Sequence, residues 1–290
     1  MTRLIVNADD FGLTPGVNRA IVELHHAGVL TSATLMARAP ATDEAIALAR
    51  ATPTLGVGCH LVLIDGVPIL PPRELPTLVD ARTGQFHPTP GAFLKRLFTG
   101  RIRASEMEAE ATAQIRLLKG RGLTLTHIDT HKHAHLFPAV LRPVLRAARA
   151  EGIAAIRNPF EPLWSAQRTA VAPLKRRIEF RILRRFARRF HHIVKQSGIA
   201  TTEGALGVLA TGTLDAAILR DILRAAPSGT FELVTHPGYN DADLARIRTR
   251  LLASRELERS ALETLRTMPN LDLVSFAALE AAPYAPSSPT

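Results

Sequence analysis

The sequence contains little of what several classes of protein require. A single cysteine, Cys59, excludes an internal disulfide, which fits a reducing compartment. No apolar run approaches the roughly 20 residues that span a bilayer, and no basic, apolar and small-residue leader precedes the first apolar segment. Only 5% of the residues are aromatic. We therefore expect a cytoplasmic protein.

The composition is that of a single folded domain. The chain has 290 residues, 46% of them hydrophobic, which is enough to bury a sizeable core. We expect this domain to span residues 1–280 and to include a basic insertion at 158–204. Residues 281–290 (AAPYAPSSPT) are small, polar and rich in proline. They cannot bury enough apolar area to offset their chain entropy, so a disordered tail is predicted.

The net charge of +10 is concentrated in one segment, 168–195, which holds ten Lys or Arg residues and one acid. Its apolar residues recur at every fourth position: Leu174, Ile178, Ile182, Phe186 and Phe190. This spacing predicts an amphipathic helix with a basic face. Three interpretations remain open: a solvated helix docked on the core, attachment to an anionic membrane surface, and nucleic-acid binding. Because no zinc-finger spacing or aromatic single-strand-binding pattern accompanies the charge, no nucleic-acid partner is expected.

Short apolar runs alternate with longer segments of helical periodicity. The candidate strands are 3–8, 31–37, 55–62, 123–131, 153–157, 205–210, 231–236 and 271–276. Helices are expected near 15–27, 41–51, 104–120, 137–151, 213–226 and 242–267. Such alternation predicts an α/β fold with parallel strands. About seven or eight units in this length favour a distorted (β/α) barrel over the alternative, an open doubly wound sheet. The Gly/Pro-rich segment 63–100 and the basic insertion are expected to be lids or binding loops.

Acidic and histidine side chains stand where these strands end. Asp9 and Asp10 close the first strand, His60 the third and His236 a later one. The fourth ends in HIDTHKHAH, which holds one acid and four histidines: His127, Asp129, His131, His133 and His135. In an extended chain, residues two apart share a face, so the side chains at 129, 131 and 133 are expected to point the same way. Parallel α/β barrels gather functional groups at the carboxyl ends of their strands, so one rim should hold all of these residues.

Each feature also has an interpretation without function. The acidic pair could cap the following helix, although Thr14 before Pro15 is a better-placed cap. A single histidine at a strand end is more often a packing residue than a ligand, and the histidine run could be a polar surface loop. Cys59 should face away from His60 and be a small buried hydrophobe. The combination at four strand ends favours a functional site.

A metal-dependent hydrolase would use this set of residues. One carboxylate and two imidazoles leave coordination positions open for water, and a divalent cation lowers the pKa of that water toward neutrality. A second carboxylate, kept off the metal, can accept the proton as water attacks a carbonyl, and an imidazolium can protonate the departing group. Mixed oxygen and nitrogen ligands do not select one metal. Zinc or magnesium is expected.

Six motifs together resemble the YdjC-like carbohydrate deacetylases. They are VNADDFG at 6–12, GVNRAI at 16–21, TSATLM at 31–36, GVGCHL at 56–61, DTHKHAHLFP at 129–138 and ELVTHPGY at 232–239. The resemblance covers about residues 1–240, in order. It implies a distorted (β/α) barrel and the metal-dependent removal of an acetyl group from an N-acetylated sugar.

Carried over position by position, the resemblance implies a role for each site residue. It implies three metal ligands: Asp10, His60 and His131. Asp9 would be the general base and His236 the acid that protonates the amine. His133 and His135 would line or orient the site. Where related proteins have a further histidine after the ligand histidine, this chain has Lys132, which on a strand should face away from the site.

The insertion suggests a subgroup and a partner. RNPFEPLW at 157–164, followed by the basic segment, resembles the hopanoid-biosynthesis-associated members, whose proposed substrate is an N-acetylglucosaminyl hopanoid. This implies peripheral contact with an anionic membrane, at the inner face of the cytoplasmic membrane, where each basic residue contributes about 1 kcal/mol of attraction. Arg157 is a candidate for a substrate contact or for a structural ion pair. The alternatives are a chitooligosaccharide deacetylase and a metal-dependent phosphoesterase, and a homo-oligomer remains open.

Overall fold

The computed structural model describes residues 2–169, 174–268 and 271–279. Within these ranges, eight parallel strands form one sheet with the order β5-β4-β3-β2-β1-β7-β6, and β8 pairs with β1 beside this path. The strands are β1 (Thr2–Phe11), β2 (Ser32–Leu35), β3 (Gly56–Leu61), β4 (His127–Thr130), β5 (Ala155–Ile156), β6 (Gly204–Leu206), β7 (Gly229–Thr235) and β8 (Asp272–Leu273). The predicted tail, 281–290, and residues 170–173 of the insertion lie outside the described ranges.

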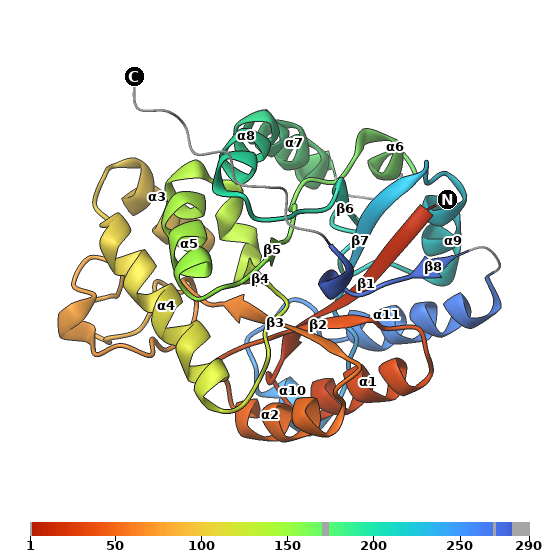
Figure 1. Cartoon of the computed structure of the whole chain (residues 1–290), viewed down its shortest axis with the longest axis horizontal. Coiled ribbons are helices and arrows are strands. Elements are labelled where there is room, and N and C mark those ends of the chain that lie inside the picture. Colours follow the sequence, from red (N-terminus) through yellow and green to blue (C-terminus); the bar gives the residue numbers. More distant parts are fainter. Residues whose placement is uncertain (1, 170–173, 269–270, 280–290) are drawn as a thin grey trace.

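Helices surround this sheet (Figure 1). In the described part of the chain they are α1 (Pro15–His26), α2 (Thr42–Ala51), α3 (Pro90–Phe98), α4 (Ala104–Gly120), α5 (Pro138–Ala150), α6 (Leu163–Ala166), α7 (Leu174–Leu183), α8 (Ala187–Ser197), α9 (Ala216–Arg224), α10 (Ala242–Ala245) and α11 (Ser254–Glu263). Parallel strands joined and covered by helices confirm the predicted α/β fold and its distorted (β/α) barrel.

The barrel is irregular at two places. The first residues of β1 pair with β8, whereas its last residues pair with β2 along the same edge. Between β5 and β6, an isolated parallel bridge from Ala155 to Ala200 replaces a regular ladder. The predicted strands 153–157 and 205–210 are correspondingly short. Pro159 has no N–H to extend β5, and Gly207, with a left-handed φ of 80°, ends β6.

Alternation along β1 sends its odd-numbered residues into the barrel. Ile5 packs there in an inner cluster: Ile5, Ala155, Ala200 and Phe276. Since β1 and β5 are not neighbours in the sheet, this contact crosses the barrel interior. Asn7 also crosses it, with its Oδ1 3.2 Å from Nε2 of His127 on β4. The same face of β1 then continues to Asp9, at the carboxyl end.

The predicted basic helix is divided into α7, a 3₁₀ segment (Arg184–Phe186) and α8. α8 buries Phe190 and Ile193 against the core. All of α7 is described, and none of its side chains is buried. Ile178 and Ile182 are 49% and 50% exposed. The interpretation of a helix docked on the core therefore describes α8, whereas α7 leaves most of its apolar side chains exposed and packs against the core through Leu183, its last residue.

The predicted helix 242–267 is also divided, into α10, α11 and a 3₁₀ turn at Thr264–Thr267. Residues 246–250 (RIRTR), between α10 and α11, alternate arginine with β-branched side chains. Like charges in close sequence and the restricted rotamers of Ile247 and Thr249 disfavour a continuous helix. The predicted helix is therefore wrong in its central part.

The Gly/Pro-rich segment 63–100 is anchored to the barrel. It contains α3, which sequence periodicity did not predict and which the Thr89 hydroxyl caps. Two glutamates of α4 accept hydrogen bonds from its backbone: Glu110 from the N–H groups of residues 69 and 70, and Glu106 from those of 77 and 78. Such bonds fix an otherwise irregular segment in place.

Candidate metal centre

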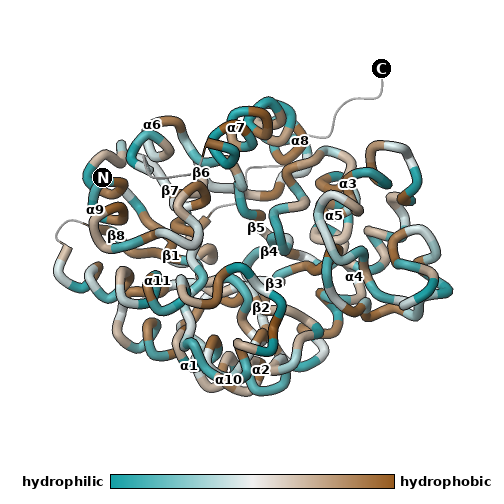
Figure 2. The backbone as a smooth tube through the Cα atoms, turned by 180° about the vertical axis from the view of Figure 1, so that it is seen from behind, coloured by the Kyte–Doolittle hydropathy of each residue, from teal (hydrophilic) through white to brown (hydrophobic). Residues whose placement is uncertain are grey.

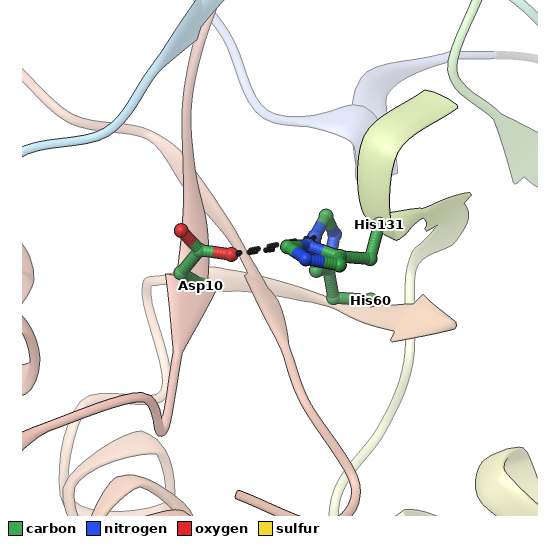
Figure 3. A group of neighbouring side chains, drawn as sticks. All are labelled: Asp10, His60 and His131. Atoms are coloured by element: carbon green, nitrogen blue, oxygen red, sulfur yellow. Dashed lines mark hydrogen bonds and ion pairs between the residues drawn. The ribbon is translucent and has the colours of Figure 1, made fainter. Parts of the chain in front are cut away.

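Three potential ligand atoms meet at the carboxyl end of the barrel (Figure 3). Oδ1 of Asp10 lies 3.6 Å from Nε2 of His60 and 3.5 Å from Nδ1 of His131. The two imidazole nitrogens are 3.3 Å apart. One carboxylate oxygen and two imidazole nitrogens suit a divalent cation and leave coordination positions open. The structure thus brings together the three residues that were expected as ligands, from β1, β3 and the turn after β4.

Asp10 reaches this position because the backbone conformation changes there. Alternation would turn the neighbours Asp9 and Asp10 to opposite faces of β1. Asp10 instead has a left-handed φ of 64°, and the pairing of β1 with β2 is irregular between Ala8 and Phe11. This conformation is uncommon outside glycine, costs about 1–3 kcal/mol and is concentrated at functional sites. It allows both adjacent carboxylates to serve one site.

His60 is oriented by another acid. Its Nδ1 lies 2.7 Å from Oδ1 of Asp129, and both side chains are buried. This pairing directs Nδ1 to Asp129 and leaves Nε2 facing the other two ligand atoms. Burial alone would lower the pKa of His60, but the carboxylate of Asp129, together with those of Asp9 and Asp10, outweighs burial and raises the pKa to about 9. A cation at this site would replace the proton on Nε2.

Asp9 is held by an arginine that has no exposed surface, Arg157. Nη2 of Arg157 lies 2.5 Å from Oδ1 of Asp9, and Nη1 lies 2.8 Å from Oδ2. Burial would raise the pKa of Asp9, but the guanidinium and the imidazoles of His60 and His236 hold it well below its usual range. Asp9 is therefore ionised at neutral pH. Of the two interpretations of Arg157, a substrate contact and a structural ion pair, these contacts are those of an ion pair.

The same guanidinium serves two further carboxylates, Asp129 and Glu232. Nε of Arg157 donates to Oε1 of Glu232 at 2.8 Å. The other oxygen of Glu232 is buried and has no hydrogen-bond partner among the described residues. Burial raises the pKa of Glu232 to about 7, although Arg157 opposes this shift. Arg157 is a single positive charge shared by three carboxylates, and Glu232 is the one of the three that can hold a proton near neutral pH.

His236 borders the Asp9 carboxylate. Its Nε2 lies 3.7 Å from Oδ2 of Asp9, and its Nδ1 lies 3.6 Å from Oε2 of Glu258. The backbone N–H of His236 donates to that same oxygen of Glu258 at 2.6 Å. Burial would lower the pKa of His236, but Glu258 raises it above its ordinary value. The imidazole is thereby suited to carry a proton at neutral pH.

The histidine run leaves the strand earlier than predicted. β4 ends at Thr130, and residues 131–136 form a 3₁₀ turn in which Lys132 and His133 have left-handed φ values of 58° and 51°. The expectation that His133 shares a strand face with His131 is therefore wrong, because the chain is no longer extended. Nδ1 of His133 is buried with no hydrogen-bond partner in the described part of the chain, and burial lowers its pKa to about 3.

Two neighbours in this turn have structural contacts. His135 is fully buried, with Nδ1 2.7 Å from the Thr130 hydroxyl and Nε2 3.2 Å from the backbone oxygen of Arg157. These contacts join the turn to β4 and to the end of β5. Nζ of Lys132 donates to Asp65 at 2.6 Å on the surface. Its outward direction comes from the turn and not from strand alternation.

Two charged residues of α11 contact the site and were not among those predicted. Arg255 and Glu258 are buried on α11 and contact Asp10 and His236. Their sequence, SRELERSALE, is typical of a charged surface helix, and it follows the stretch that carries the resemblance. Residues three apart share a helix face, and this spacing of Arg255 and Glu258 was the feature of the sequence that could have indicated a shared contact. Asp129 was expected near the site, but its bond to His60 was not.

A family model described as YdjC-like protein matches residues 3–268. The chain belongs to this family. A carbohydrate deacetylase of Brevibacillus brevis is 44% identical over 146 residues, which are 50% of this YdjC-like chain and 55% of that protein. The chain thus matches about half the length of that relative. A carbohydrate deacetylase of Thermoanaerobacter pseudethanolicus is 29% identical over 265 residues, 90% of this chain and 91% of that protein.

A solved structure from Enterococcus faecalis resembles this YdjC-like protein over almost its whole length. That protein, provisionally described as a cellobiose-phosphate cleavage protein, gives a TM-score of 0.70 at 26% identity, with 95% of this chain and 97% of that chain covered. The barrel is therefore shared beyond the motifs at its rim. In the described part of the YdjC-like chain, no helix is both long and apolar enough to cross a membrane.

Proposed function

We propose that this YdjC-like protein is a metal-dependent carbohydrate deacetylase, a hydrolase that removes the acetyl group from an N-acetylglucosamine-containing substrate. The observation that carries the proposal is the meeting of Asp10, His60 and His131 beside an ionised Asp9 and beside His236, whose pKa is raised above its ordinary value. The names of both sequence relatives support hydrolysis of an amide bond in a carbohydrate.

The residues divide the reaction between them. A divalent cation, zinc or magnesium, held by Asp10, His60 and His131 would polarise the amide carbonyl and lower the pKa of water. Asp9 would accept the proton that water loses as its oxygen bonds to the carbonyl carbon. The low pKa of Asp9 keeps it ionised and also makes it a weak base, so Asp9 would pass this proton to Nε2 of His236, 3.7 Å away, once that imidazole has given its own proton to the amine. As the C–N bond breaks, Nε2 of His236 would protonate the amine.

A finer proposal concerns the substrate, an N-acetylglucosaminyl hopanoid carried by a membrane, and it is supported by the position of α7. Nη1 of Arg176 donates to the backbone oxygen of Thr211, and Nη1 of Arg184 donates to that of Glu161, both at 2.6 Å. These acceptors lie in the loops after β6 and β5. α7, through Arg176, and the 3₁₀ segment that follows it, through Arg184, are thus tied to the carboxyl end of the barrel, where the site is.

The surface of α7 suits an anionic bilayer. Hydrophilic and hydrophobic residues lie side by side along it (Figure 2), and Leu174, Ile178 and Ile182 are 72%, 49% and 50% exposed among its basic residues. Apolar insertion combined with charge attraction is the usual mode of interfacial helices. A helix of this kind would bring the site to a lipid-linked sugar.

Vesicle sedimentation tests the membrane contact. The protein should bind phosphatidylglycerol vesicles at low salt, bind less as salt screens the charges, and ignore neutral vesicles. Replacing Leu174, Ile178 and Ile182 by serine should abolish binding. Val67→Ser removes another exposed apolar side chain, 40% exposed and far from α7 in sequence, and should change nothing. Equal sedimentation of all three proteins would reject α7 as the membrane-binding element.

The reaction is tested by acetate release from an N-acetylglucosaminyl hopanoid and from chitobiose. Wild type reconstituted with metal should release acetate from the lipid-linked sugar, and Asp9→Asn should lose about 10²–10⁴-fold in rate while retaining the metal. Release from chitobiose alone would favour the chitooligosaccharide deacetylase. Release from neither, with hydrolysis of a phosphate ester, would replace the proposal by the metal-dependent phosphoesterase.

A further inference from the structure

We propose that α11 positions both halves of the site: Arg255 holds the metal ligand Asp10, and Glu258 holds the acid His236. The proposal rests on the deacetylase function for the roles of those two partners, and the contacts are independent of it. Arg255 and Glu258 are three residues apart and therefore share one face of the helix. Both are buried, with 1% and 0% of their surface exposed.

Arg255 fixes the carboxylate of Asp10 from the side opposite the ligand histidines. Its Nη2 donates to Oδ2 of Asp10 at 2.5 Å, while Oδ1 is the oxygen that faces His60 and His131. One oxygen is thus occupied by a charged donor and the other is directed to the cation site. Carboxylate ligands are commonly oriented in this way by a hydrogen bond to their second oxygen.

The loop after β7 leaves room for this arginine. A Cβ at Gly238 would lie 3.0 Å from Cδ of Arg255 and 3.1 Å from Cγ2 of Val17. Any larger residue at 238 would have to displace the arginine side chain or the α1 side chain beneath it. Gly238, two residues after the proposed acid His236, therefore leaves the space that the Arg255 side chain occupies.

Glu258 joins the acid to a second strand-end loop. Its Oε2 accepts from the backbone N–H of His236, and its Oε1 accepts from the N–H of Gly212, at 2.6 and 2.9 Å. The charged or titratable groups that face the imidazole are Glu258 from α11, Asp9 and Asp10 from β1, and His133 from the turn after β4. Glu258 is nearest to Nδ1, so it favours a proton there while Nε2 faces Asp9.

A purely structural helix would not need these charges. Buried ionic residues lose their hydration, which destabilises the fold, and apolar residues of similar volume often replace them without loss of stability. On α11 both charges are directed at proposed functional groups. The apolar contacts that dock this helix come from other positions, such as Leu262, which is fully buried. Positioning of the site accounts for the two charges better than packing does.

Zinc affinity tests the first contact. Isothermal titration of the metal-free full-length protein should show zinc binding about 10–100-fold weaker for Arg255→Met than for wild type. The matched control is Arg259→Met, which removes another arginine of α11 that pairs with Glu263, and it should bind zinc like wild type. Unchanged zinc affinity in Arg255→Met would overturn the role of Arg255, whether or not the enzyme deacetylates any sugar.

The pH dependence tests the second contact. Glu258→Gln retains a hydrogen-bond acceptor and removes the charge, so the pKa of His236 should fall and the basic limb of kcat/KM should move to lower pH by about one unit or more. NMR titration of His236 should show the same fall. Glu263→Gln, at the exposed end of α11, should alter neither. A uniform loss of rate with an unmoved limb and an unchanged NMR titration would indicate a packing role only.

The NMR titration and the zinc titration need no turnover. If wild type releases no acetate from either sugar, the proposed function fails, but both measurements still decide the positioning roles. If Glu258→Gln does not fold, Glu258→Asp withdraws the carboxylate from the imidazole by one methylene and should give a smaller shift in the same direction. No shift in a folded Glu258→Asp protein would then count against the proposal.

Discussion

The left-handed conformation of Asp10 allows two adjacent carboxylates, Asp9 and Asp10, to reach the same site, whereas a regular strand would direct them to opposite faces. Asp9 follows the inward face of β1 and contacts Arg157, whereas Asp10 turns to the ligand histidines. Asparagine and aspartate tolerate this backbone conformation better than other non-glycine residues. Two adjacent acids can therefore have different partners and opposite requirements: one is proposed to bind a cation, and the other to remain free of it.

The Arg157 cluster makes stability depend on pH through Glu232. Its folded pKa of about 7 exceeds the ordinary value of 4.5, so its contribution is fully present below pH 4.5 and is lost as the pH rises through 7. Glu232→Gln cannot ionise. The free energy of unfolding of the variant minus that of wild type should therefore be about 1–3 kcal/mol larger at pH 8 than at pH 5, so the variant is relatively more stable at pH 8.

Urea unfolding at pH 5 and pH 8 measures this difference. Glu263→Gln, which changes an exposed carboxylate with a side chain 51% accessible, is the control and should show the same stability relative to wild type at both values. An equal effect of Glu232→Gln at pH 5 and pH 8 would show that Glu232 has an ordinary pKa in the folded protein.

Part of the site could be predicted from single residues. Asp10, His60 and His131 stand at strand ends, and the barrel brings such ends together whatever the intervening sequence. Arg255 and Glu258 could not be singled out, because a charged residue on a helix is usually exposed and its burial depends on packing of the whole chain. Regular strand alternation does not hold at Asp10, which is left-handed itself, or at His133, where both Lys132 and His133 are left-handed and redirect the side chain.

At the scale of elements, the basic insertion contains two helices with different tasks. α8 has a buried apolar face, whereas three apolar side chains of α7 are exposed: Leu174, Ile178 and Ile182. Phe190→Ala should lower the free energy of unfolding by about 3–5 kcal/mol, since it leaves a cavity. Ile178→Ala should change it by about 0.5 kcal/mol or less, as exposed substitutions do. Urea unfolding of both variants checks the contrast; similar losses would mean that α7 is also docked.

The boundaries of these elements were less predictable than their type. The periodicity of apolar residues indicated α1, α2, α4 and α5 closely, since one face of each is buried against the sheet. Apolar residues at every fourth position predicted a continuous basic helix, but this spacing alone does not indicate which of them pack against the core.

At the scale of the whole molecule, the proposed ligands join segments that are far apart in the sequence: β1, β3 and the turn after β4. A cation that binds only this arrangement stabilises the fold by about 2.7 kcal/mol at a concentration of 100 Kd. Removing it with a chelator should lower the Tm by roughly 5 °C. Asp10→Asn should show no such shift in the same calorimetric scan. An unchanged Tm for chelated wild type would contradict a site of this affinity.

The position of β1 has a consequence for synthesis of the chain. Thr2 pairs with Gly229, and Arg3 with Asp272, so β1 is synthesised well before β7 and β8, the strands that complete its edges. Contacts between distant residues are slow to form, and an apolar strand with open edges can pair with other chains in the interval. We expect yield in cells to depend on the speed of translation and on chaperones, even for variants whose finished fold is as stable as wild type.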